Sequence, residues 1–234
     1  MPRRPSTVSR LRYWLSYFWE QTLEVTESEY NAYLQVCVVQ GRLQLVAEDA
    51  IYSFGDLYLN FRKLFEVFDF GQLPERASVL VLGLGLGSIP ELLEQHVGTR
   101  YRYTAVEIDP VIIELASTYS LPGLKSSLEI VQADASAFVQ LDERRYDLIC
   151  VDVFQDATVP EHLERADFLQ FCTARLRSGG ALVYNRLASS LPARNAAQAY
   201  FTEVFSPAFP PAQLYDTGGN FMLVNDGKFL TLPQ

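Results

Sequence analysis

The chain is poor in the residues that build metal centres and disulfide frameworks. It has only 2 histidines and 3 cysteines among 234 residues. His96 and His162 lie far apart, and neither belongs to a ligand-spaced pair such as H-x-H, so no metal site is expected. The cysteines are odd in number and have apolar neighbours, which indicates buried reduced thiols; they are Cys37, Cys150 and Cys172.

Long apolar runs and positive charge are also scarce. No run approaches the ~20 apolar residues of a membrane-spanning helix. The early stretch YWLSYFW, residues 13–19, is too short and too aromatic for a secretory signal, so we expect a cytoplasmic protein without a membrane partner. The net charge of −9 repels phosphate backbones, so nucleic acid is not an expected partner either.

What the sequence does contain, from residue 77 onward, is the pattern of an α/β domain. Five apolar strand-like segments alternate with helical segments; they are SVLVLG, YTAVEID, LEIVQAD, DLICVDVF and GALVYNR. Such alternation predicts a parallel sheet covered on both faces. The last two strand-like pieces, AQLYDT and NFMLVND, predict a C-terminal antiparallel hairpin. We therefore expect an α/β fold with a Rossmann-like, mostly parallel seven-stranded sheet.

The first 72 residues follow a different pattern. A short helix is predicted in LRYWLSYFWEQ, then a small β-hairpin turning at Gln40 and Gly41, then a helix in GDLYLNFRKLFEVFDF. We interpret residues 1–72 as a small N-terminal helix and β region, and residues 73–234 as the Rossmann-like domain. The aromatic stretch 13–19 has two open interpretations: packing inside the chain, or the contact surface of a homodimer.

The segment VLVLGLGLGSIPELL, residues 79–93, carries the first chemical signal. Gly83, Gly85 and Gly87 join a strand to a helix and let a ligand approach with no Cβ in the way. Ser88, with Glu91 three residues later, is the expected helix cap. The spacing G-x-G-x-G differs from the dinucleotide pattern G-x-G-x-x-G and is more typical of loops that hold S-adenosylmethionine-like nucleosides. A ligand-free tight turn and a nicotinamide-dependent oxidoreductase are the alternatives.

Acidic residues end the next strands, where a parallel sheet binds its ligands. Glu107, twenty positions after Gly87, suits a ribose, and the alternative is a solvated strand end. Asp134 suits an adenine amino group, with the amide of Ala135 near a ring nitrogen, and the alternative is a helix cap. Asp152 ends the fourth strand, where the chemistry is expected.

Two further acids belong to the same strand ends. Asp156 lies in the loop after Asp152 and is a second candidate for the chemical step. Asp109 directly precedes a proline and a helical pattern, so we expect it to cap that helix.

At these residues the chain, from about residue 30 to its end, resembles the spermidine synthase family within the class I S-adenosylmethionine-dependent methyltransferase fold. The matching segments are VLVLGLGLGSIPELL, AVEIDPVII, VQADASAFV and YDLICVDVFQD. The resemblance implies S-adenosylmethionine or its decarboxylated form as the donor. It implies Asp152 as a catalytic residue and Tyr52 on the substrate side. The loop after Asp152 departs from the family pattern, and Asp156, at a shifted spacing, is the candidate for the second catalytic acid. The implied nucleoside site comprises Gly83, Gly85, Gly87, Glu107, Ile108, Asp134 and Ala135.

Leu86 departs from the family pattern. It stands where the resemblance implies an acid that contacts the aminopropyl ammonium of the donor. An ammonium beside apolar carbon is costly to desolvate. We therefore expect a transferase acting on a small acceptor, such as an amine, with methyl transfer preferred slightly over aminopropyl transfer. The alternatives are an orthodox polyamine aminopropyltransferase and a nucleoside-binding module without turnover.

Overall fold

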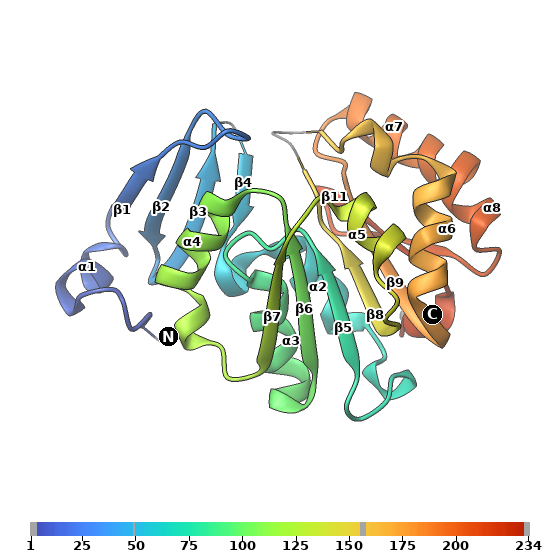
Figure 1. Ribbon diagram of the computed structural model, residues 1–234. Coiled ribbons are helices and arrows are strands. Elements are labelled where there is room, and N and C mark those ends of the chain that lie inside the picture. The colour runs from blue at the N-terminus through green and yellow to red at the C-terminus, as the bar shows by residue number, and fades with distance from the viewer. Residues whose placement is uncertain (1–3, 49, 155–157, 232–234) are drawn as a thin grey trace.

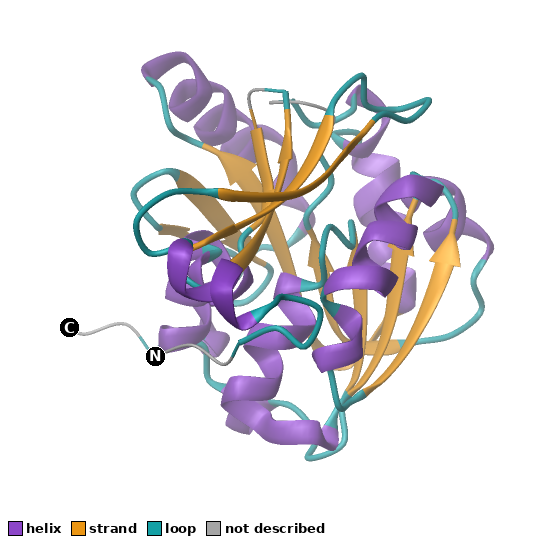
Figure 2. Cartoon of the chain, turned by 90° about the vertical axis from the view of Figure 1, so that its left-hand side faces the viewer, coloured by secondary structure: helices purple, strands orange, loops and turns teal. Residues whose placement is uncertain are grey.

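The computed structural model describes residues 4–48, 50–154 and 158–231. The strands form two separate sheets, one of four strands and one of seven. Figure 1 shows the smaller sheet near the N-terminus, beside the larger α/β part of the chain, and Figure 2 shows the same arrangement from the side. The strands are β1 Gln21–Thr26, β2 Leu34–Val39, β3 Arg42–Ala47, β4 Ala50–Ser53, β5 Ser78–Leu82, β6 Arg102–Glu107, β7 Ser127–Gln132, β8 Tyr146–Val151, β9 Leu176–Leu187, β10 Gln213–Asp216 and β11 Asn220–Val224. The helices are α1 Arg10–Leu15, α2 Leu59–Val67, α3 Ser88–Val97, α4 Pro110–Tyr119, α5 Ala135–Leu141, α6 Ala166–Arg175, α7 Leu191–Tyr200 and α8 Ser206–Ala208.

The large sheet has the predicted α/β architecture. Its seven strands lie in the order β10-β11-β9-β8-β5-β6-β7, and β11 is antiparallel to both of its neighbours while the other pairs from β9 to β7 are parallel. The C-terminal antiparallel hairpin, β10 and β11, is therefore confirmed. The strand order reverses between β5 and β8, so the carboxyl ends of these two strands flank the crevice where such sheets bind ligands.

Burial explains why the central strands read as continuous apolar runs. Every residue of β8 is buried, and in β5 only the first residue is partly exposed. The edge strand β7 instead alternates between exposed and partly buried residues. One buried cluster joins the small sheet with α2, α3 and α4 on one face of the large sheet, and a second cluster joins α5, α6 and α7 on the other face. Helices thus cover both faces, as the pattern predicted.

The N-terminal region contains more strand than the sequence indicated. The predicted hairpin is present as β2 and β3, but β1 and β4 extend it to a sheet in the order β1-β2-β3-β4. β4 has only four residues, and β1 mixes two apolar residues with polar ones, so neither gave a clear strand pattern. The division of the chain after residue 72 stays a prediction.

The aromatic stretch of residues 13–19 is mostly exposed. Tyr13 is 7% exposed and packs in the first cluster, whereas Trp14, Phe18 and Trp19 are 54%, 80% and 59% exposed. Packing inside the chain therefore accounts for Tyr13 alone among these four, and the homodimer stays a prediction. All three cysteines are free and buried, as expected. In the described part of the chain, no helix has the length and apolar character to cross a membrane.

Candidate active site

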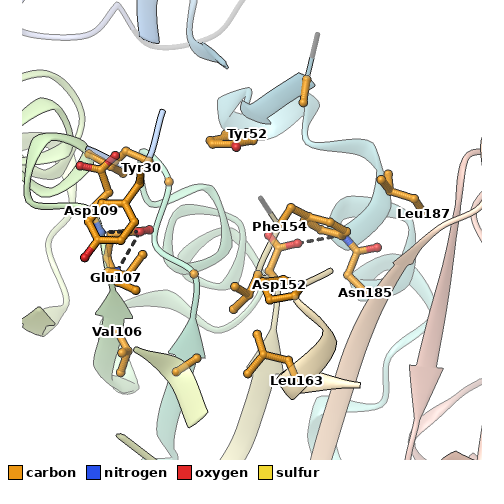
Figure 3. A pocket seen from close by; sticks show the side chains of 18 of the residues that line it. Tyr30, Tyr52, Val106, Glu107, Asp109, Asp152, Phe154, Leu163, Asn185 and Leu187 are labelled. Atoms are coloured by element: carbon orange, nitrogen blue, oxygen red, sulfur yellow. Dashed lines mark hydrogen bonds between the residues drawn. The ribbon is translucent and has the colours of Figure 1, made fainter. Parts of the chain in front are cut away.

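A cavity of about 990 Å³ lies at the carboxyl ends of the parallel strands, between the large sheet and the segment from β4 to α2. Its lining includes residues from the glycine loop, from the ends of β6, β7 and β8, and from β4 and the start of β11. Figure 3 shows Val106, Glu107 and Asp109 on one side of this cavity and Asp152, Phe154 and Asn185 on the other. The predicted strand-end acids therefore meet around one space.

The three glycines of the loop have two different surroundings. Gly83 and Gly85 line the cavity, but Gly87 does not belong to its lining. Gly83 has φ of 90°, and a Cβ there would collide with the carbonyl group of Asp152 on the neighbouring strand. Gly87 has φ of 81° and is the N-cap of α3, where a Cβ would lie 2.9 Å from a methyl carbon of Leu121. In this conformation Gly87 starts the helix, and its predicted contact with the nucleoside stays a prediction.

The predicted capping role of Ser88 is wrong. The helix begins at Ser88 itself, and no side chain caps it. The Ser88 hydroxyl instead lies 2.5 Å from the hydroxyl of Ser53 in β4. Since the αL conformation is open to glycine, Gly87 can take the cap position, and Ser88 then links the glycine loop to the small sheet.

Glu107 ends β6 with its carboxylate held by backbone amides. Oε2 accepts a hydrogen bond from the amide of Leu84 at 3.0 Å, and Oε1 accepts from the amides of Ile108 and Asp109 at 3.0 and 3.2 Å. Burial raises the pKa of Glu107, while the amide hydrogen bonds act in the opposite direction. Because a carboxylate has about four acceptor positions, it can also accept from a ligand hydroxyl. Ile108 contributes its amide to this arrangement and lines the cavity.

Asp134 caps α5, which was the alternative interpretation of this residue. Its Oδ1 accepts a hydrogen bond from the amide of Ala137 at 2.9 Å. Its Oδ2 lies 3.0 Å from Nε2 of His162, which belongs to a short 3-10 turn, Glu161–Leu163, before α6. Asp134, Ala135 and His162 all line the cavity, so capping does not remove Asp134 from the candidate site.

Asp152 follows β8 and lies at the centre of a hydrogen-bond network. Its Oδ1 accepts from the hydroxyl of Tyr58 at 3.1 Å and from Nδ2 of Asn185 at 2.8 Å, while Oδ2 has no hydrogen-bond partner among the described residues. Burial raises the pKa of Asp152 to about 6, although both hydrogen bonds favour the ionised form. A carboxylate with this pKa can accept a proton near neutral pH.

Asn185 and Tyr58 are held by their own neighbours. Oδ1 of Asn185 accepts a hydrogen bond from Nδ2 of Asn220 at 2.9 Å, so this buried amide has one orientation. Tyr58 directly precedes α2, its ring stacks on Phe61, and burial raises the pKa of its hydroxyl. The position of the Asp152 carboxylate is therefore determined by α2, β9 and β11 together.

Tyr52 lies opposite Asp152 in the cavity wall, as Figure 3 shows. Its hydroxyl donates a hydrogen bond to Oδ1 of Asn31 at 3.0 Å. Asn31 in turn donates to Oδ2 of Asp109 at 2.7 Å, and Ser28 donates to the same oxygen. Asp109 also caps α4 by accepting from the amide of Val111, which confirms its predicted role. This chain of hydrogen bonds connects the small sheet to the nucleoside side of the cavity.

Two predicted positions fall outside the cavity or outside the described residues. Leu86 is 4% exposed, packs in the first buried cluster and is not part of the cavity lining. Asp156 lies outside the described residues, so its role stays a prediction.

Sequence reasoning missed Tyr58, Asn185 and His162. The one usable signal was Asn185, a polar residue near the end of the apolar segment GALVYNR, at the same sheet edge as the predicted acids.

No protein-family model matches the chain. Among curated proteins, it is 33% identical to a polyamine aminopropyltransferase of Vibrio vulnificus over 124 residues, which is 52% of this chain and 40% of the relative. It is 29% identical to a probable polyamine aminopropyl transferase of Bifidobacterium longum, over 72% of this chain and 38% of the relative. An N-terminal histidine N-methyltransferase of Emericella nidulans is 35% identical over 47% of this chain and 20% of the relative. The chain thus spans two fifths or less of these relatives.

Solved structures show the same fold. A spermidine synthase in complex with the transition state analogue AdoDATO superimposes with a TM-score of 0.67 at 18% identity, over 87% of this chain and 72% of that chain. Human methyltransferase-like protein 13, solved in complex with SAH, has a TM-score of 0.53 at 24% identity, over 70% and 73% of the two chains.

The strand order, the terminal antiparallel hairpin and these neighbours together define the class I methyltransferase-like fold. Among proteins of this fold, the chain is similar in sequence to polyamine aminopropyltransferases and in fold to a spermidine synthase. The resemblance indicated by the motifs is therefore confirmed.

Proposed function

We propose that the protein is a transferase that moves an alkyl group from an adenosyl sulfonium donor to an amine acceptor. The observation that carries this proposal is the position of Asp152, whose carboxylate shares one cavity with Glu107 and the glycine loop. In this arrangement Gly83, Gly85 and Ile108 border the nucleoside, Glu107 accepts from its ribose, and Asp134 with Ala135 borders the adenine. The positions of these residues in the cavity lining support the assignments.

Asp152 supplies the acid–base function on the acceptor side. Tyr58 and Asn185 hold Oδ1, so Oδ2 can accept a hydrogen bond from the acceptor nitrogen and take its proton. Since a sulfonium is already a good electrophile, the protein mainly has to align the acceptor nitrogen with the carbon that is transferred. Tyr52, across the cavity from Asp152, borders the acceptor.

Aminopropyl transfer from the decarboxylated donor is the first version of this function. Five carboxylate side chains and neither lysine nor arginine occur among the described residues that line the cavity. Such a lining favours a donor that carries an ammonium and no carboxylate, since an unpaired carboxylate would face other negative charges. Most of the curated relatives have names that refer to the same reaction. The slight preference for methyl transfer that we drew from Leu86 gains no support from them.

Methyl transfer from S-adenosylmethionine is the second version, and Leu86 is the observation that favours it. The acid expected to contact the donor ammonium is replaced by a buried leucine outside the cavity. A methyltransferase relative and a methyltransferase neighbour have this reaction in their names.

Calorimetric titration tests the proposal and separates its two versions. The ligands are S-adenosylmethionine and its decarboxylated form, with methylthioadenosine as the shared core. Tighter binding of the decarboxylated form would support aminopropyl transfer, and the reverse order would support methyl transfer. If the wild-type protein binds none of the three at micromolar concentrations, the proposed function is wrong. If Glu107→Gln weakens all three alike, the ribose assignment is supported, and Glu114→Gln on the exposed surface of α4 is the control.

A further inference from the structure

The short turn before α6, Glu161–Leu163, contributes a histidine to the cavity that the proposed reaction does not use. His162 lines the cavity together with Asp134, and its Nε2 lies 3.0 Å from Oδ2 of that aspartate. Because an ionised carboxylate only accepts hydrogen bonds, Nε2 is the donor in this pair and carries the hydrogen. His162 therefore contacts the side chain that the proposed function places beside the adenine.

The position of His162 is set by buried contacts of its turn. Leu163, the next residue, is fully buried and labelled in Figure 3, and its carbonyl oxygen accepts a hydrogen bond from the hydroxyl of Tyr184 at 3.1 Å. Glu164, directly after the turn, forms an ion pair with Arg186, which is 7% exposed. Since Tyr184 and Arg186 both belong to β9, the large sheet holds the turn that brings His162 to the cavity.

The exposure of this pair indicates that it orients a carboxylate more than it stabilises the fold. The side chains of His162 and Asp134 are 47% and 34% exposed, and a contact this exposed contributes little to folding because water competes for both groups. The other oxygen of Asp134, Oδ1, accepts from the amide of Ala137 in α5. With one oxygen bound to α5 and the other to His162, the plane of the carboxylate is fixed.

From these contacts we propose that His162 is a positioning residue through which the donor site selects an adenine over a 6-oxopurine. The inference rests on the proposed function, because it takes Asp134 as the neighbour of the adenine amino group. A carboxylate oxygen has two lone pairs, so Oδ2 can accept from Nε2 of His162 and from the 6-amino group together. A 6-oxopurine presents an oxygen at this position, and two acceptor oxygens would then face each other without a hydrogen between them.

This selectivity depends on a fixed position of Oδ2. Without the donor of His162, only the contact between Oδ1 and Ala137 remains, and the carboxylate can turn about it so that Oδ2 moves away from the base. Because Asp134 is partly exposed, water can replace His162 as the donor to the displaced oxygen. The 6-amino group would then lose part of its hydrogen bond, and the 6-oxo group would meet less repulsion. The discrimination between the two bases should therefore fall.

Calorimetric titration with methylthioadenosine and methylthioinosine measures this selectivity, because the two nucleosides carry an amino and an oxo group at the same position of the base. The wild type should bind methylthioadenosine at least about 30-fold more tightly. His162→Phe keeps a ring but has no donor, and it should lower this ratio of affinities about tenfold. His162→Gln, whose side-chain amide can donate from a similar distance, should keep the ratio within about threefold of wild type.

Arg165→Ala is the matched control. It also removes an exposed ion pair beside this turn, the one with Glu161, but Arg165 does not line the cavity, so the ratio should stay at the wild-type value. Thermal unfolding of each variant checks that the fold is intact, and His162→Ala replaces His162→Phe if the phenylalanine is not accommodated. An equal weakening of both nucleosides in a folded variant would leave the ratio unchanged, assign His162 a structural role alone and overturn the inference.

A double substitution tests whether His162 acts through Asp134. Asp134→Ser keeps a cap on α5 but lacks Oδ2, so adding His162→Phe to it should not change the ratio further. An additional loss as large as in the wild-type background would show that His162 acts on the base without Asp134, and would contradict the inference. Wild-type protein that binds neither nucleoside would refute the proposed function and the inference together. A wild type that prefers methylthioadenosine, with the same ratio in His162→Phe, would refute the inference alone.

Discussion

Asp152 combines the proposed chemistry with a cost in stability. Its pKa of about 6 in the folded protein lies well above the 3.8 of an exposed aspartate. Asp152→Asn keeps an oxygen that can accept from Tyr58 and Asn185 but removes the base. We expect turnover to fall about 100- to 10,000-fold, while the donor Kd, measured by calorimetry, changes less than threefold. An unchanged kcat would show that Asp152 is not the proton acceptor.

The same substitution should stabilise the fold above pH 6. A carboxyl group with a raised pKa in the folded state contributes stability at low pH, and this contribution is lost as the pH rises from about 4 to about 6. The Asp152→Asn variant has no carboxyl group to ionise at this position, so it does not lose this stability as the pH rises. Its free energy of unfolding should therefore exceed that of the wild type by about 1–3 kcal/mol at pH 7 and by less at pH 4. Urea unfolding at the two pH values measures the difference, and equal stabilities at both would contradict the pKa shift.

Tyr58 is a positioning residue in this scheme, and its test is a pH profile. Its hydroxyl bonds to Oδ1 of Asp152 and favours the ionised carboxylate. Tyr58→Phe should therefore raise the pKa of Asp152, so the acidic limb of the profile of kcat/KM against pH should move from about 6 to higher pH. Tyr30→Phe, on the opposite side of the cavity in Figure 3, is the control and should leave the limb in place. A loss of activity without movement of the limb would indicate a structural role alone.

At the residue scale, the sequence predicted the acids and missed their partners. Glu107, Asp134 and Asp152 stand out because a charged residue directly follows an apolar strand, and parallel strands bring such ends together. Tyr58 gave no signal, since a tyrosine before an aromatic-rich helix resembles a packing residue. Its contact with Asp152 joins residues 94 positions apart. Such a contact depends on how α2 packs against the sheet, which no local pattern specifies.

At the scale of elements, Gly83 controls how closely the ends of β5 and β8 approach. A Cβ at this position would meet the carbonyl oxygen of Asp152 and lie 2.8 Å from its carbonyl carbon. Gly83→Ala should therefore destabilise the protein by more than about 2 kcal/mol through strand displacement and the strain of a positive φ. Gly123→Ala, where nothing lies within 4 Å of an added Cβ, is the control. Thermal unfolding compares the two, and equal melting temperatures would contradict the steric argument.

Asp134 has one function within its element and a proposed second one in the cavity. Its side chain caps α5. A serine caps helices about as well as an aspartate, but its shorter side chain would not reach a nucleoside in the cavity. Asp134→Ser should therefore preserve thermal stability within about 1 kcal/mol and weaken methylthioadenosine binding about tenfold in calorimetry. Asp134→Ala should lower the thermal stability and also weaken methylthioadenosine binding. If Asp134→Ser binds the nucleoside as tightly as the wild type, Asp134 is only a cap.

The elements themselves were predictable where pattern and length were both sufficient. Long apolar runs that alternate with helical segments predicted the parallel sheet from the sequence. These runs correspond to strands β5, β6, β8 and β9. β4 was not recognised, although it brings Tyr52 and Ser53 to the cavity and the glycine loop. It has four residues and pairs with β3 through an irregular register, so its strand character depends on the neighbouring strand rather than on its own sequence.

At the scale of the whole molecule, the small sheet takes part in forming the candidate site. It shares a buried cluster with α2, α3 and α4, and it contributes a wall of the cavity through β4. The carboxylate of Asp109, which is 1% exposed, accepts hydrogen bonds from the side chains of Ser28 and Asn31, two residues that precede β2. The sequence predicted Asp109 only as a helix cap, because its partners lie 81 and 78 residues earlier in the chain.

Asn31 is the residue at which this connection can be broken. It is 7% exposed and links Tyr52 to Asp109. Asn31→Ala removes one hydrogen-bond partner from the buried Asp109 and one from the half-buried Tyr52, so we expect a loss of about 1–3 kcal/mol in the free energy of unfolding. Because Asn31 lies between the two sheets, the loss should be local at first. Hydrogen exchange should accelerate in β2 and β3 more than in β5 and β8.

The same variant separates a structural connection from a functional one. If the small sheet forms the acceptor wall, Asn31→Ala should raise the KM for the amine about tenfold through the displaced Tyr52 and leave the donor Kd within threefold of wild type. Asn195→Ala, on the exposed surface of α7, is the control and should change neither value. Exchange that accelerates equally in both sheets would show that the molecule opens as one unit. A raised donor Kd together with an unchanged KM for the amine would place the small sheet beside the nucleoside instead of the acceptor.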